Sequence, residues 1–157
     1  MALHRRGRPT VPELDSPRRT RAGSGPHPLP RQVGKHADPA TELSAKRLGL
    51  LKEAIPNAAR IAVIWNANDR AMTLRFDEVE RAARLLNVTV QPLAVRKPED
   101  IDKALSAMTR ERPDAFFVVS DSLTTGNRKR IVDFAAAQQL PAMYEFDIFV
   151  QDGGLMS

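Results

Sequence analysis

The sequence predicts an α/β protein: a three-layer, doubly wound sandwich in which helices cover both faces of a mainly parallel sheet. Short apolar runs rich in β-branched and aromatic residues recur at Arg60–Asn66, Thr89–Val95 and Ala115–Ser120. Segments with apolar residues at helical spacing separate these runs. Strands that alternate with helices indicate right-handed βαβ units, and such units build parallel sheets.

Residues 1–40 differ in composition from the rest, and we expect a disordered basic tail followed by one α/β domain over residues 41–157. The tail holds seven of the 12 prolines and shows neither a helical nor a strand period. It carries eight Lys or Arg against three Asp or Glu, so the net charge of +5 lies there and the remainder is neutral.

The tail also bears on targeting and partners. It has no apolar stretch of the kind a signal peptide needs, so no signal peptide is expected. Its arginines suit non-specific contact with phosphates, but no aromatic residues are interleaved for stacking on bases. We therefore expect no specific nucleic-acid partner. No apolar stretch is long enough to span a membrane.

The domain begins with a predicted helix that ends at Pro56. Its apolar face is assigned to Leu43, Leu50, Leu51 and Ala54, which recur at helical spacing. The strand at 60–66 comes next. A second helix carries its apolar residues at helical spacing as well, namely Phe76, Val79, Ala83 and Leu86.

The strand at 89–95 is predicted to lie at an edge of the sheet, because Pro92 cannot donate a ladder hydrogen bond. An edge position for the second strand fits the flavodoxin-like order 2-1-3-4-5. The remaining expected elements, in chain order, are a helix from Pro98 with Ile101, Leu105 and Met108, the strand at 115–120, a helix with Ile131, Phe134 and Ala135, and short strands at 141–145 and 153–157.

Polar residues follow three of the apolar runs at the point where each strand ends. In an open parallel sheet these carboxyl ends lie at one edge, and ligands bind in the crevice beyond it. The sequence therefore predicts one wall of a small-molecule site at this edge. The expected ligand-binding residues are Asn66, Asn68, Ser120, Asp121, Ser122, Tyr144 and Glu145.

Each of these residues also has a structural interpretation that the sequence leaves open. Asp121 has the chemistry of a helix cap, and one carboxylate can both cap a helix and contact a ligand. Asn66 and Asn68 are turn formers. Tyr144 is as consistent with a core residue, and Glu145 with a solvated one.

Enzyme chemistry is not expected. The chain has no cysteine, and its three histidines, His4, His27 and His36, all lie in the tail. The phosphate-binding loops GxGxxG and GxxxxGK[ST] and the GxSxG elbow are absent. A receiver domain would need an acidic pair after the first strand, where only Asp69 occurs. We expect no cofactor and no metal site.

Four segments carry a resemblance to a known family. They are ELSAKRLGLLKEAIPNAARIAVIWN, RERPDAFFVVSD, RIVDFAAAQQLPAMYE and FVQDGGLMS. Together, from about Glu42 to the end, they resemble the substrate-binding component of ABC transporters, in an uncharacterised branch related to tryptophan-binding lipoproteins. The resemblance implies a type I periplasmic binding fold, of which this chain looks like the second lobe.

The resemblance also implies a function and partners. It implies a small-molecule ligand such as an amino acid, an ABC permease as partner, no catalysis, and a periplasmic or lipid-anchored extracytoplasmic location. The lack of a signal peptide leaves a cytoplasmic location open. Two alternatives remain: a ligand-sensing regulatory lobe, LacI-like or receiver-like, and a non-functional truncated fragment.

Overall fold

The computed structural model describes residues 38–157. The predicted disordered tail therefore lies outside the described residues, apart from its last three positions. Of these, Pro39 and Ala40 already belong to the first helix, so that helix begins two residues before the predicted domain boundary. Proline is well suited to a first helical turn, because the N–H group it lacks would have no partner there.

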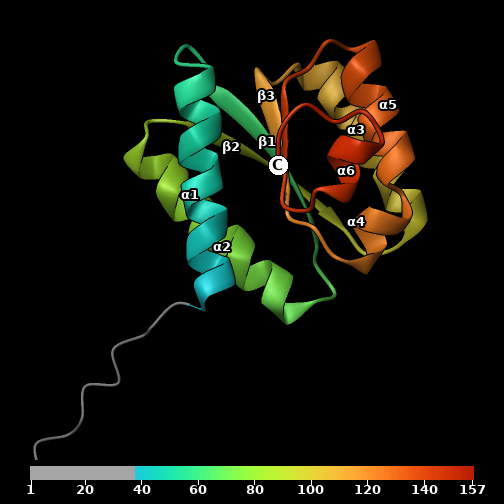
Figure 1. The fold of residues 1–157 in the computed structure, drawn as a ribbon, viewed down its shortest axis with the longest axis horizontal. Coiled ribbons are helices and arrows are strands. Elements are labelled where there is room, and N and C mark those ends of the chain that lie inside the picture. Colours follow the sequence, from blue (N-terminus) through green and yellow to red (C-terminus); the bar gives the residue numbers. More distant parts are fainter. Residues whose placement is uncertain (1–37) are drawn as a thin grey trace, which may run out of the picture. The chain divides into compact units, whose positions relative to one another are not determined.

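Ten elements follow one another in the described part of the chain, and helices separate successive strands (Figure 1). They are α1 (Pro39–Ala54), β1 (Arg60–Asn66), α2 (Arg70–Leu85), β2 (Thr89–Val95), α3 (Pro98–Glu111), β3 (Ala115–Val118), α4 (Ser122–Gly126), α5 (Arg128–Ala137), β4 (Ala142–Tyr144) and α6 (Ile148–Gln151).

The four strands form one parallel sheet in the order β2-β1-β3-β4, which confirms the predicted topology for these strands. β2 lies at the edge, as Pro92 predicted, with Pro92 opposite Val63 of β1. β1 and β3 occupy the centre, and all four residues of β3 are buried. Every strand runs the same way, so all four carboxyl ends lie at one edge.

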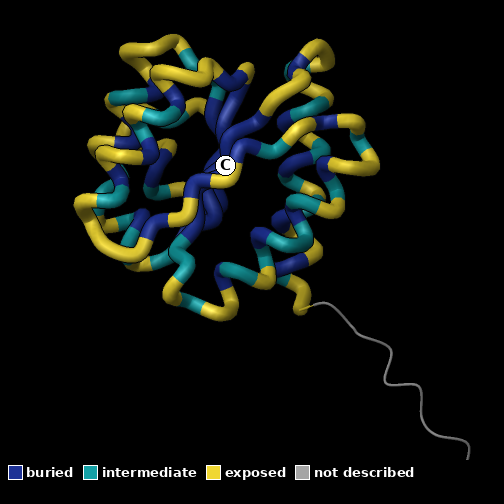
Figure 2. The backbone as a smooth tube through the Cα atoms, turned by 180° about the vertical axis from the view of Figure 1, so that it is seen from behind, coloured by how far each residue is buried: buried dark blue, intermediate teal, exposed yellow. Residues whose placement is uncertain are grey.

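Helices cover both faces of this sheet, so the three-layer sandwich is confirmed (Figure 1). On one face, α1 and α2 pack over a core that includes Val63 and Phe117. On the other, α3, α5 and α6 pack over a core that includes Ile64 and Phe116. Figure 2 shows the strands as buried chain between helices whose outer sides are exposed. This alternation of side chains between the faces follows from the two-residue period of a strand.

The apolar face predicted for α1 is partly wrong. Leu43, Leu50 and Ala54 are exposed, whereas Leu51 and Leu48, which the prediction did not assign, are fully buried. Thr41 and Ser44 complete the buried face. The prediction counted only apolar residues. The helix is instead oriented with a serine inward, because the Ser44 hydroxyl finds a carboxylate partner beneath it.

The predicted fifth strand is present only as a single bridge. Met156 pairs in parallel with Met143 of β4, at the position that the order 2-1-3-4-5 assigns to it. The Tyr144 N–H donates to the Met156 carbonyl at 3.0 Å. Gly154 lies just before this bridge and packs closely against the Tyr144 ring. The C-terminal segment is thereby held against the edge of β4.

Candidate functional site

Hydrogen bonds connect polar groups beyond the carboxyl ends of all four strands. We call Asn66, Asn68, Ser120, Asp121 and Glu145 the polar belt. It begins beyond β2, where the Asn68 side-chain amide donates to the Arg96 carbonyl at 3.2 Å. It ends beyond β4 at the Glu145 carboxylate. The predicted convergence of polar groups at this edge therefore exists for five of the seven residues.

The centre of the belt lies between β1 and β3. The Asn66 Nδ2 donates to Asp121 Oδ2 at 2.7 Å, and Asn66 Oδ1 accepts from the Asn68 N–H at 3.0 Å. Asp121 is also the N-cap of α4: its Oδ1 accepts from the Thr124 N–H at 3.0 Å. Both interpretations left open for Asp121 are thus compatible, because one oxygen caps the helix while the other faces Asn66.

Asn66 and Asn68 likewise form a turn and at the same time lie at the carboxyl edge of the sheet. The Asn68 N–H bonds to Asn66 Oδ1 two residues back, which is an Asx turn. Directly after it, Asp69 caps α2 by accepting from the Ala71 N–H at 2.8 Å. The loop after β1 is therefore fixed by its own side chains, and this fixes the two amide groups at the edge.

Beyond β3 and β4 the belt is buried. Ser120 is fully buried, and its N–H donates to Glu145 Oε2 at 3.0 Å. The Glu145 N–H donates in turn to the Ser120 hydroxyl at 3.3 Å. This reciprocal pair continues the contact between β3 and β4 past the last ladder bond. Glu145 is only 6% exposed, so the interpretation as a solvated residue is wrong.

Two residues that the sequence did not reveal complete the surroundings of Glu145. The Ser44 hydroxyl of α1 donates to Glu145 Oε1. Arg75 of α2 donates from Nη1 to Glu145 Oε2 at 3.3 Å and forms an ion pair with it. A buried carboxylate is stable only when it is paired and hydrogen bonded, and Glu145 has both kinds of partner. The only feature of the sequence that pointed to these two partners is that Ser44 and Arg75 lie close to the inner faces of their helices.

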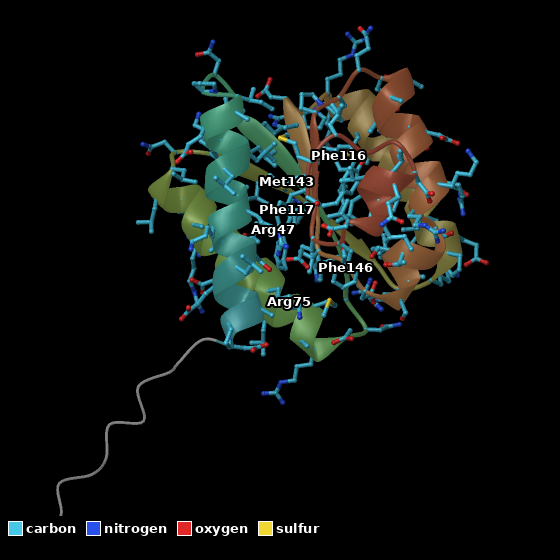
Figure 3. The ribbon with its side chains drawn as sticks, in the orientation of Figure 1. Arg47, Arg75, Phe116, Phe117, Met143 and Phe146 are labelled. Atoms are coloured by element: carbon cyan, nitrogen blue, oxygen red, sulfur yellow. The ribbon has the colours of Figure 1, made fainter. Side chains whose placement is uncertain are left out.

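A cavity of about 150 Å³ opens beside this ion pair. Arg47 and Arg75 contribute two guanidinium groups to its lining. Glu145 and Phe146, which follow β4, line it as well. Figure 3 shows that Arg47 comes from α1 and Arg75 from α2, with Phe146 close to both. Ala40 and Leu43, from the start of α1, are the remaining apolar lining residues.

The structure does not bring Tyr144 and Ser122 into the belt. The Tyr144 side chain is fully buried on the side of α5 and α6, stacked on Phe149 with ring centroids 4.7 Å apart. It lines a separate, mainly apolar cavity of about 290 Å³. The prediction that Tyr144 lies at the ligand edge is therefore corrected. β4 ends at this edge, but the Tyr144 side chain points into the layer of α5 and α6. Ser122 is exposed in the first turn of α4.

A larger cavity, of about 340 Å³, lies at the opposite edge of the sheet. It is lined by residues at the ends of α3 and α5, among them Met108, Arg112 and Gln138, that precede β3 and β4. No network of side-chain hydrogen bonds comparable to the belt adjoins it within residues 38–157. We therefore place the candidate site at the carboxyl edge, where the polar groups converge.

Within residues 38–157 no group of three or more His, Asp or Glu side chains is placed to hold a metal ion. No helix of this part of the chain is long and apolar enough to cross a membrane.

Comparison with known proteins gives one family. A family model described as ABC transporter substrate binding protein matches residues 40–157, which is most of the chain. This family serves transport and is not an enzyme family. A search of curated proteins found no match.

Similar solved structures share the fold. An ABC domain from Streptococcus pneumonia, solved in complex with L-Trp, is 21% identical with a TM-score of 0.66, over 71% of this chain and 38% of that chain. A conserved domain protein from Vibrio cholerae is 18% identical with the same TM-score and coverage. A substrate-binding protein from Desulfitobacterium hafniense, in complex with Leu, is 13% identical with a TM-score of 0.55, over 74% and 35%. The chain thus spans well under half the length of these proteins.

Proposed function

The chain belongs to the family of ABC transporter substrate binding proteins, and we propose that its polar belt is one wall of a small-molecule binding cleft. The observation that carries the proposal is the Asn66–Asp121 hydrogen bond of 2.7 Å between the ends of β1 and β3. In a sheet of order 2-1-3-4 this is the switch point, where crossover connections diverge and ligands bind.

The chemistry of the belt supports a small polar ligand. Asn66 and Asn68 carry amide groups that donate and accept, and Asp121 carries a half-buried carboxylate. A carboxylate beside amides suits an ammonium or hydroxyl group. Proteins of this fold have been solved with L-Trp and with Leu, which supports an amino acid or a similar small molecule as the ligand of this chain.

The proposed cleft needs a second wall. In a two-lobed protein, a ligand that bridges both lobes favours the closed state over the open state. The chain described here supplies one lobe, so on its own it makes part of the contacts while most of the cost of immobilising the ligand remains. Losing half of about −8 kcal/mol turns a micromolar affinity into a millimolar one. We propose an ABC permease as the partner and an extracytoplasmic location.

A ligand panel tests this function. The 157-residue chain is screened by ligand-observed NMR against the L-amino acids and small organic acids at millimolar concentration. We expect at least one compound to bind, and Asp121→Asn to weaken that binding at least fivefold, because the belt loses the half-buried charge of Asp121. Asparagine caps helices about as well as aspartate, so the fold is retained.

Asp133→Asn is the matched control, because it removes one carboxylate from the exposed face of α5 that has no hydrogen bond with the belt. It should leave the affinity within twofold of the wild type. If Asp121→Asn binds every active compound as tightly as the wild-type chain does, the belt is not the ligand wall.

A further inference from the structure

We propose that the cavity between Arg47, Arg75 and Phe146 is an anion subsite that holds the carboxylate of a ligand with an apolar body. This inference rests on the proposed function and specifies it: the belt would orient the ligand, and the cavity would select its charge.

The cavity has more positive than negative charge. Arg47, Arg75 and Glu145 line it, which leaves a net charge of one positive unit. The Glu145 carboxylate is already satisfied, because the Ser44 hydroxyl reaches one oxygen while the Ser120 N–H and Arg75 reach the other. It has little capacity left for a cationic ligand.

The two guanidinium groups retain donors. Arginine has five N–H donors, and Arg75 uses one of them on Glu145, at 3.3 Å. That distance is longer than the 2.7–2.9 Å of a strong charge-assisted bond, and Arg75 keeps its other N–H donors for a second anion. Arg47 is half-buried and makes no ion pair within residues 38–157. A planar fork of N–H donors matches a carboxylate.

The rest of the lining is apolar, and this determines the body of the ligand. Leu43 and Phe146 are each 43% exposed, and Ala40 lies beside them at the start of α1. A volume of about 150 Å³ accommodates one six-membered ring. The geometry therefore fits an aliphatic or aromatic carboxylate better than a phosphate or a sugar, since those ligands would leave the apolar side chains without partners.

The test uses the full 157-residue chain labelled with ¹⁵N, and two probes of the same shape, phenylacetate and uncharged phenylacetamide. Phenylacetate should shift the backbone amide signals of Leu43, Arg47 and Phe146 in a saturable way at millimolar concentration. Phenylacetamide should bind at least tenfold more weakly. Arg47→Gln should weaken phenylacetate at least fivefold, and Arg47→Lys, which keeps the charge, should recover part of the loss.

Arg110→Gln is the matched control. Arg110 is exposed in the last turn of α3, which packs on the other face of the sheet from α1 and α2, so this variant removes one positive charge without touching the cavity. It should bind phenylacetate within twofold of the wild type. Thermal melts of all three variants determine whether each is folded. If Arg47→Gln does not fold, Arg47→Lys still tests the role of this side chain, because it keeps the charge but lacks the planar fork of N–H donors.

Three results would overturn the inference: equal binding of the two probes, wild-type affinity in Arg47→Gln, or no response to phenylacetate at about 50 mM, where a millimolar site is nearly saturated. A response confined to Asn66, Asn68 and Asp121 would also overturn it while leaving the proposed function standing, so the two failures are distinguishable.

Discussion

Tyr144 and Glu145 are neighbours at the carboxyl end of β4, but their side chains point to opposite layers of the fold. Glu145 turns toward α1 and α2, where Ser44 and Arg75 meet it. Tyr144 turns the other way, edge-on to Phe116 and stacked on Phe149. Its hydroxyl has no hydrogen-bond partner among the described residues, and burial raises the pKa of the phenol above its usual value.

The state of this phenol can be measured directly, because Tyr144 is the only tyrosine of the chain. In the folded chain we expect no phenolate absorbance at pH 10, where an exposed tyrosine is half ionised. The pKa is raised in the folded state, so the unfolded chain loses its proton first. The free energy of unfolding is therefore at its full value below about pH 10 and falls as the pH rises further.

A spectrophotometric pH titration followed in parallel by circular dichroism tests this expectation, with the same titration in denaturant as the control. Half-ionisation of Tyr144 near pH 10 in a chain that still has its native circular dichroism would show that the hydroxyl reaches water.

At the scale of the elements, the C-terminal segment depends on one close contact. A Cβ atom on Gly154 would lie 2.5 Å from Cε2 of Tyr144 and 2.8 Å from the Phe149 carbonyl oxygen. Both neighbours are part of the core, and the carbonyl belongs to the backbone, so neither can move freely. A side chain at this position would therefore force the segment from α6 to Met156, or the core beneath it, to shift.

Gly154→Ala should accordingly lower the free energy of unfolding by roughly 1–3 kcal/mol, the usual cost of overpacking. Gly49→Ala is the opposite control, because a Cβ atom at this position meets no atom within 4 Å. Alanine in place of glycine inside a helix should raise the free energy of unfolding by about 0.5–1 kcal/mol. Urea denaturation of both variants measures the difference. Equal stability of Gly154→Ala and the wild type would mean that the segment does not pack as described.

The elements also show what the sequence could and could not predict. The bounds of β1 and β2 were predicted to the residue, because apolar β-branched runs end abruptly in polar loops. The short helices α4 and α6, of five and four residues, are too short to show a helical period and were missed. The contacts of Glu145 with Ser44 and Arg75 were missed for another reason. These residues are 101 and 70 positions apart from it in sequence, and only the packing of helices on the sheet brings them together.

At the scale of the whole molecule, the described residues form a lobe whose polar belt lies along a single edge of the sheet. The topology made this edge predictable, because parallel strands place all their carboxyl ends together. The structure adds that hydrogen bonds join the polar groups from Arg96 to Asp121 and from Ser120 to Glu145, and that two arginines lie beside Glu145. The chain spans 38% of the L-Trp-bound structure, which is consistent with the proposal that a second lobe supplies the other wall of the cleft.

We propose that the carboxyl edge, and not the larger cavity at the opposite edge, receives the ligand. A ¹⁵N chemical-shift map of the full chain, titrated with the tightest compound of the panel, tests it most directly. We predict saturable shifts of the amide signals of Asn66, Asn68 and Asp121, with those of Met108, Arg112 and Gln138 unchanged. The reverse pattern, with shifts at Met108, Arg112 and Gln138 and none at the polar belt, would contradict the claim.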